Sequence, residues 1–159
     1  MLKPATTDIE ALKILDERLR CLSAWTIHHA NHLRTSADGL KVGGHQASCA
    51  SMTSIMAALY FYVPGPNDRV AVKPHAGPVL HAIHYLLGTQ SREALENFRG
   101  FGGAQSYPSR TKDGIPVDFS TGSVGLGVAV TLFASLVQDY LTAHGWLDDA
   151  QRGRIVALI

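Results

Sequence analysis

The sequence is poor in cysteine and in charge of either sign. Of its 159 residues only 2 are cysteines, Cys21 and Cys49, and they do not form a CxxC pair. So few cysteines exclude a disulfide-stapled scaffold and are typical of a reduced, cytoplasmic setting. The formal net charge of +1, without a basic block, lacks the electrostatic footprint of nucleic-acid binding. We therefore expect no nucleic-acid partner.

Long hydrophobic runs are also missing. The longest apolar stretch, from Val124 to Val137, is interrupted by Thr131 and Ser135 and is shorter than the roughly 20 residues of a membrane span. We expect it to form a buried helix, and we expect no membrane partner. The overall composition, 46% hydrophobic and 17% charged, fits one globular domain. The low share of charged residues favours a domain that is buried inside a larger protein.

Hydrophobic spacing predicts alternating helices and strands. Helix-forming stretches occupy 8–34, 47–61, 78–87, 91–99 and 124–144. Strand-like runs occupy 69–72 and 154–159, and a Gly/Ser/Pro-rich segment without periodicity occupies 100–118. Strands joined by right-handed helical crossovers predict an α/β fold, with a parallel sheet and flanking helices.

Candidate ligand-binding residues follow from this topology, because sites in open parallel sheets lie beyond the carboxyl ends of the strands. Lys73 and His75 come directly after the first strand, and we expect them at that edge. His45 follows a Gly-Gly pair, which breaks the chain before a helix. The glycines of TGSVGLG, at 121–127, precede the long helix, and a residue without Cβ allows close backbone approach to a ligand.

Several motifs stand in a recognisable order. They are GGHQASCAS (43–51), KPHAGPVLHAIHYLLG (73–88), LENFRGFGGAQSYPS (95–109), STGSVGLGVA (120–129) and RIVALI (154–159). In order and content they resemble the first half of a thiamine-diphosphate-binding domain. The resemblance is to the family of transketolase and the homodimeric decarboxylating component of pyruvate dehydrogenase, and it covers roughly Leu19 to Ile159. GGHQAS favours the pyruvate dehydrogenase side, since transketolases usually read SGHPG there.

The resemblance implies roles for individual residues. His45 and His75 would be the catalytic pair, lining the diphosphate and the substrate end of the cofactor, tasks that suit an imidazole. The main-chain carbonyl of Val124 would accept a hydrogen bond from the aminopyrimidine, and Leu126 would lie beside that ring. The cofactor-binding set would be Ser48, Lys73, Tyr107, Gly122, Val124, Gly125 and Leu126. Lys73 departs from the family, which usually has Gln there.

The resemblance also implies cofactors and organisation. The complete enzyme would use thiamine diphosphate and Mg²⁺, and in the family a Gly-Asp-Gly/Ala loop directly after the strand matching RIVALI holds the metal. Because this chain ends before that loop, no Mg²⁺ ligand is expected in it. We expect an N-terminal helical segment, 1–40, then a partial diphosphate-binding domain, 41–159, incomplete at its C-terminus. Such a cut should expose a sheet edge and the underside of the 124–144 helix.

The expected activity is that of a 2-oxo acid dehydrogenase decarboxylating component. The complete enzyme, a homodimer by family precedent, would act on a 2-oxo acid and pass the acyl unit to a lipoyl-bearing acyltransferase. The chain alone is expected to be inactive, because the family also needs a glutamate from a pyrimidine-binding domain. Two alternatives stay open: transketolase activity, and a non-catalytic module that pairs with a full-length relative. The other histidines are assigned to helix faces without a metal role: His28, His29, His32, His81, His84 and His144.

Overall fold

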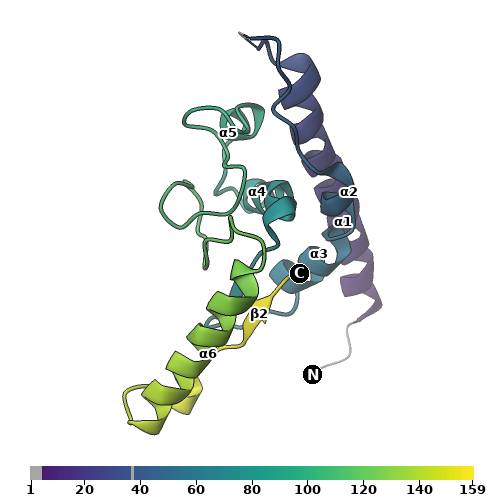
Figure 1. The fold of residues 1–159 in the computed structure, drawn as a ribbon. Coiled ribbons are helices and arrows are strands. Elements are labelled where there is room, and N and C mark those ends of the chain that lie inside the picture. The colour runs from purple at the N-terminus through teal and green to yellow at the C-terminus, as the bar shows by residue number, and fades with distance from the viewer. Residues whose placement is uncertain (1–4, 37) are drawn as a thin grey trace.

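The computed structural model describes residues 5–36 and 38–159 and shows a mixed helix and strand fold with a small parallel sheet (Figure 1). Residues 1–4 and 37 of the expected N-terminal segment lie outside the described residues. The helices are α1 (Thr6–His28), α2 (Gln46–Ala50), α3 (Thr53–Phe61), α4 (Gly77–Leu86), α5 (Arg92–Glu96) and α6 (Leu126–Ala143). The strands are β1 (Arg69–Ala71) and β2 (Ile155–Ala157). Shorter helical turns cover His29–Leu33, Pro74–Ala76 and Asp149–Gln151.

Most predicted elements are confirmed, and one is divided. The stretch 47–61 forms two helices, α2 and α3, because the Met52 N–H bonds three residues back to the Cys49 carbonyl at 2.9 Å. That contact tightens the turn and ends α2 before α3 begins. The segment 100–118 contains no helix or strand, as its composition predicted.

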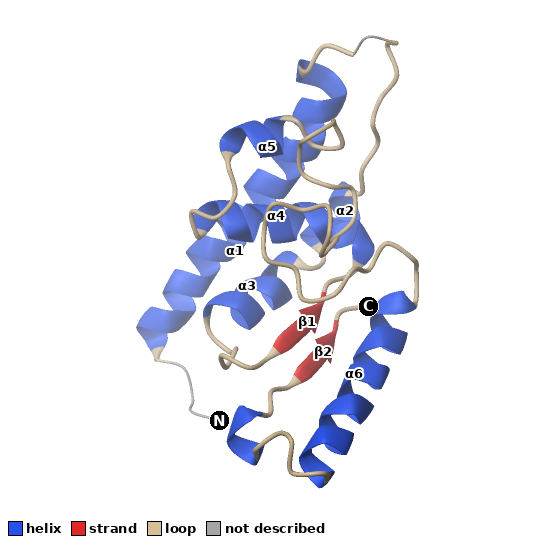
Figure 2. Cartoon of the chain, turned by 90° about the vertical axis from the view of Figure 1, so that its left-hand side faces the viewer, coloured by secondary structure: helices blue, strands red, loops and turns tan. Residues whose placement is uncertain are grey.

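The two strands pair in parallel, as predicted. Arg69 lies opposite Ile155 and Ala71 opposite Ala157. A parallel pair needs a long crossover, and here the chain between the strands includes α4, α5 and α6. Figure 2 shows the strands lying between α6 on one side and α3 on the other. The sheet therefore separates the helical core from α6.

The hydrophobic core lies among α1, α3 and α4. Leu19 of α1, Met56 of α3 and Ile83 of α4 are all 0% exposed. Phe98, after α5, is equally buried and belongs to the same cluster. Burial of each such side chain stabilises the fold by about 1.5 to 3 kcal/mol, so this layer holds the framework on which β1 ends.

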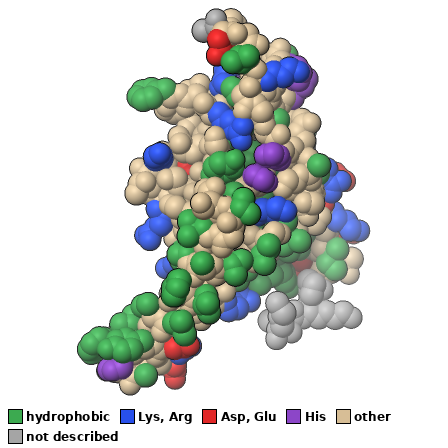
Figure 3. Space-filling model, viewed as in Figure 1, with side chains coloured by type: hydrophobic (Ala, Val, Ile, Leu, Met, Phe, Trp, Pro, Cys, Tyr) green, Lys and Arg blue, Asp and Glu red, His purple; other side chains and the backbone are tan. Residues whose placement is uncertain are grey.

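Helix α6 forms where predicted, but the expectation that it is buried is wrong. Within α6 only Thr131 is buried, while Leu132, Phe133 and Val137 are 55% to 64% exposed. Figure 3 shows hydrophobic side chains gathered along this helix. The expected exposure of one helix face is thus confirmed, because two strands are too narrow to cover it. By length and composition alone, the 18 residues of α6 could also cross a membrane.

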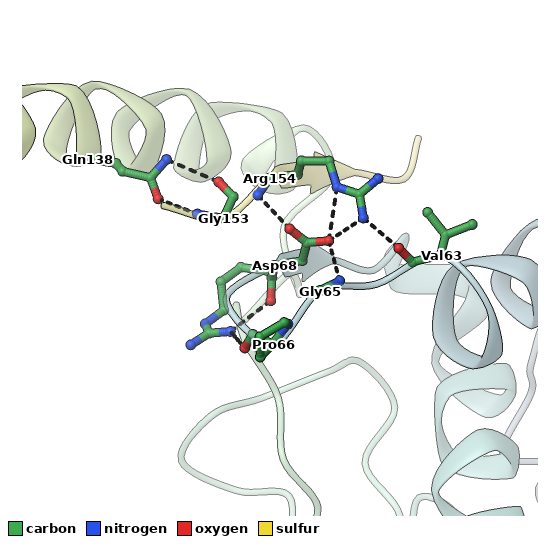
Figure 4. A network of polar contacts seen from close by, with 8 residues as sticks. Val63, Gly65, Pro66, Asp68, Gln138, Gly153 and Arg154 are labelled. Carbon is green, nitrogen blue, oxygen red and sulfur yellow. Dashed lines mark hydrogen bonds and ion pairs between the residues drawn. The ribbon is translucent and has the colours of Figure 1, made fainter. Parts of the chain in front are cut away.

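Polar contacts fix the start of β2 to the turn before β1 (Figure 4). The Asp68 carboxylate accepts hydrogen bonds from the Arg154 N–H at 2.6 Å, the Arg154 Nε at 2.9 Å and the Gly65 N–H at 2.8 Å. These donors, Arg154 first, lower the pKa of Asp68. The Gln138 amide pairs with the Gly153 backbone at 3.0 and 3.1 Å and ties α6 to the same turn. The register of the sheet is therefore set by side chains at its amino end.

Candidate functional site

The Gly-Gly-His turn has a backbone that only glycine adopts easily. Gly43 and Gly44 have φ of 76° and 136°, and a Cβ on Gly44 would lie 2.8 Å from a methyl carbon of Ile27. The Asn31 side-chain amide accepts from the Gly43 N–H and donates to its carbonyl, both at 2.9 Å. The turn is therefore held against α1, and it places His45 at the start of α2.

The structure brings His45 and His75 together. His75 lies in the short turn after β1, and its ring stacks on that of His45 with centroids 4.0 Å apart and an interplanar angle of 29°. The Cys49 thiol donates to the His75 carbonyl at 3.4 Å, which ties α2 to this turn. The Tyr107 ring lies 6.0 Å from the His75 ring. Three predicted site residues thus converge from three separate segments.

The environment of His75 favours its neutral form. Its partial burial lowers the pKa, and the positive charges of His45, Lys73 and Arg99 lower it further. A neutral imidazole carries one N–H donor and one acceptor, so it can both give and take a hydrogen bond or proton near pH 7.

A cavity of about 240 Å³ opens beside His75, at the carboxyl ends of both strands. It is lined by Lys73, Pro74, His75, Val124, Gly125, Gly127, Val128, Leu158 and Ile159. Gly125 begins α6 with φ of 85°, and a Cβ on Gly127 would lie 3.6 Å from the Ala71 Cβ. The glycines thus let the start of α6 approach the end of β1. Lys73 and His75 thus lie at the carboxyl edge of the sheet, where we expected them.

Five predicted residues do not line this cavity: His45, Ser48, Tyr107, Gly122 and Leu126. Leu126 begins α6 and is 42% exposed. Gly122 instead lies against Tyr107, and both line a second cavity of about 380 Å³. The proposed contact of Leu126 with a ring in the first cavity is therefore not supported by its placement.

Ser48 carries a buried polar atom. Its Oγ is inaccessible to water and forms no hydrogen bond with any described residue. An unpaired buried hydroxyl is costly, so such an atom is a candidate for pairing with a ligand. Its place in α2, one turn after His45, agrees with the predicted site.

Sequence reasoning missed Thr121, which holds the glycine-rich loop in place. Its buried hydroxyl donates to the Val72 carbonyl at 2.6 Å, and its N–H donates to the Pro108 carbonyl at 3.1 Å. Sequence reasoning also left out Gly127, Val128 and the end of the last strand. The sequence did carry one signal: Thr121 stands within STGSVG, directly before the glycine-rich loop.

The donor set fits an anionic ligand better than it fits a metal ion. Lys73 and the two imidazoles supply cationic and N–H donors. Over 5–36 and 38–159, however, no three His, Cys, Asp or Glu side chains come close enough to hold a metal ion. His28 and His32 stack with centroids 4.8 Å apart, without a third ligand among the described residues. The described residues thus offer donors for an anion and no group of ligands for a metal ion.

Fold and site together define a parallel α/β unit with a histidine-lined cavity at the carboxyl edge of its sheet. No family model matches the chain. The pyruvate dehydrogenase E1 component of Mycobacterium tuberculosis is 28% identical over 149 residues, and that of Pseudomonas aeruginosa 30% over 142. These matches cover 87% and 84% of this chain and 16% of each relative. Human transketolase is 34% identical over 142 residues, covering 79% of this chain and 20% of that protein.

The chain is therefore a relative of the pyruvate dehydrogenase E1 components and transketolases, as its motifs predicted. It spans 16% to 20% of the length of these curated relatives and matches their N-terminal part.

Proposed function

We propose that this chain forms one wall of the thiamine diphosphate site in a 2-oxo acid dehydrogenase decarboxylating component. The observation that supports this most directly is the stacked pair His45 and His75, because His75 lines a cavity that Val124 and Gly125 also line. When bound, thiamine diphosphate supplies a carbanion and an electron sink. The whole enzyme would be a cytoplasmic homodimer that hands its product to a lipoyl-bearing acyltransferase.

The residues of this chain would bind and orient the cofactor. Lys73 and His45 would donate charge-assisted hydrogen bonds to phosphate oxygens. His75, held neutral, would exchange a proton with a substrate oxygen. The Val124 carbonyl would accept from an exocyclic amine, and Gly125 leaves room for that approach because it has no Cβ.

Magnesium does not fit the described residues, and its ligands would have to come from elsewhere in the complete enzyme. The proposed site is therefore a partial one. We expect the chain alone to bind thiamine diphosphate weakly and to be catalytically inactive.

Transketolase activity is a second candidate, and sequence identity favours it. The human, mouse and rat transketolases are each 34% identical to this chain, against 27% to 30% for the pyruvate dehydrogenase components. The latter cover more of the chain, up to 87%. Substrate preference separates the two activities. Pyruvate would perturb the NMR resonances of His75 if the chain comes from a pyruvate dehydrogenase component, and a ketose phosphate would perturb them if it comes from a transketolase.

NMR titration of the isotope-labelled chain tests the proposed site. Thiamine diphosphate, with and without Mg²⁺, should shift resonances of His45, Lys73, His75 and 124–125 in a saturable manner at millimolar concentration. His45→Ala with His75→Ala should abolish these shifts, whereas His144→Ala, beyond the end of α6, should leave them unchanged. Absence of saturable shifts, or shifts confined to another surface, would contradict the proposal.

A further inference from the structure

A buried histidine of α4 holds the loop that carries Tyr107. His81 is 0% exposed, and its Nε2 lies 3.1 Å from the Gln105 carbonyl oxygen. On the other side of the ring, the Gln90 amide nitrogen lies 3.0 Å from Nδ1. A carbonyl can only accept and an amide N–H only donates, so the ring is neutral with its proton on Nε2. Both ring nitrogens of this buried histidine are therefore hydrogen-bonded, one to Gln105 and the other to Gln90.

Asp113 closes the same loop from within. Its side chain is 1% exposed, and its two oxygens accept from the Gln105 N–H at 3.3 Å and the Ser109 N–H at 2.8 Å. Those two amides lie on either side of Tyr107 in the chain, so one carboxylate binds both ends of the turn. Asp113 Oδ1 also lies 3.7 Å from His81 Nε2. The histidine and the carboxylate thus meet at the Gln105 peptide.

The apex of the turn lies against the start of α4. A Cβ on Gly77 would lie 3.1 Å from the Ser106 carbonyl oxygen, so a larger residue there would displace the loop. Gly77 is two residues from His75 and four from His81, which places both histidines on one continuous rigid segment. Because the loop is fixed to that segment, the Tyr107 ring stays 6.0 Å from the His75 ring.

We propose that His81 and Asp113 are positioning residues, which act through the Gln105–Ser109 turn to hold Tyr107 beside His75. A buried histidine and aspartate could instead merely fill the core. Their contacts argue otherwise, because each is directed at the backbone of this one turn. The geometry is independent of the proposed cofactor; only the use of Tyr107 toward a ligand rests on the proposed function.

Three variants test the positioning role. His81→Leu removes the donor to Gln105. His81→Gln keeps an amide N–H at the position of Nε2. Thr89→Val is the matched control, because it removes the 2.8 Å hydrogen bond to His84 on the same helix and has no partner in the turn. The measurements are amide hydrogen exchange at Gln105 and Ser109 and the nuclear Overhauser contact between the Tyr107 and His75 rings.

We expect His81→Leu to speed exchange at both amides by about tenfold or more and to abolish the ring contact, since a buried hydrogen bond is lost. His81→Gln should restore both readouts, and Thr89→Val should leave them as in the parent chain. The proposal is overturned if His81→Leu keeps both readouts, if His81→Gln fails to restore them, or if Thr89→Val has the same effect. If His81→Leu does not fold, the same two measurements are made on Asp113→Asn and decide the proposal. This variant keeps one of the two acceptor oxygens of the Asp113 side chain. Neither readout involves cofactor binding, so this inference and the proposed function can fail separately.

Discussion

The rings of His45 and His75 stack at 4.0 Å, although one residue begins α2 and the other follows β1. Two imidazoles this close cannot both be protonated without repulsion, and the positive charge of His45 is one cause of the lowered pKa of His75. The contact therefore favours a neutral His75 ring beside the cavity that His75 lines.

The first prediction concerns this coupling. NMR titration of the His75 ring should give a pKa below 6.5, the ordinary value for histidine. His45→Ala should move that pKa back toward 6.5 without reaching it, because partial burial is the larger cause and remains. A His75 pKa that is the same in both proteins would contradict the coupling.

The second prediction concerns the Gly-Gly turn. Gly44→Ala should lower the free energy of unfolding by about 1 to 3 kcal/mol, since it adds a Cβ at φ of 136° and within 2.8 Å of Ile27. Gly114→Ala is the control, because its Cβ would meet nothing within 4 Å and its φ is not positive. Urea denaturation of both variants compares them, and equal stability would show that the turn tolerates a side chain.

The third prediction concerns the loop before α6. Thr121→Val keeps the shape of the side chain but leaves the Val72 carbonyl without its 2.6 Å partner, at a cost of about 1 to 3 kcal/mol. Thermal melting should show the loss, and hydrogen exchange at Thr121 should rise. Thr111→Val, at an exposed hydroxyl in the preceding loop, should change neither measurement.

The fourth prediction concerns acid stability. Burial lowers the pKa values of His81 and His84, with Asp113 facing both rings and Asp118 facing His84 as opposing influences. The unfolded chain, with histidine pKa values near 6.5, therefore binds protons that the folded chain does not. The free energy of unfolding should fall as pH drops below about 6.5, by up to about 1.4 kcal/mol per pH unit for each buried ring.

His81→Gln should flatten this dependence, because it removes one titrating ring from the core. Chemical denaturation between pH 7.5 and 5 measures the slope, and His144→Gln, at an exposed histidine, is the control. A slope that does not change in His81→Gln would show that other groups carry the acid sensitivity.

The fifth prediction concerns α6. Its exposed apolar face should make the isolated chain self-associate as its concentration rises, because water is excluded when such faces meet. Phe133→Glu with Val137→Lys, both on the exposed side, should shift the sedimentation velocity profile toward monomer. A parent chain that is monomeric at every concentration would contradict this expectation.

Much of the architecture could be predicted from local pattern. The spacing of apolar residues located α1, α4 and α6, and short β-branched or apolar runs located both strands. The order of the motifs placed His45, His75 and Val124 at one site. The structure brings the first two into contact, and His75 and Val124 line one cavity. The helices and strands were readable because each depends on residues close together in the chain, whereas the grouping of these three residues came from the family resemblance.

Other features depend on contacts between distant segments and had no local signal. The exposure of α6 is one of them, because it is set by how little sheet lies beneath that helix. The clasp of Asp113 on the turn that holds Tyr107 is likewise invisible in sequence, since any aspartate in a polar loop reads as solvent-exposed.

By itself, the sequence determined the elements, their parallel pairing and the family to which the chain is related, because periodicity and motif order are properties of the chain alone. Only the tertiary structure decided which side chains share the cavity, which histidines stay neutral and which helix face is left uncovered. Those outcomes depend on burial and on distances of a few ångströms between segments far apart in sequence, and both are created only when the chain packs.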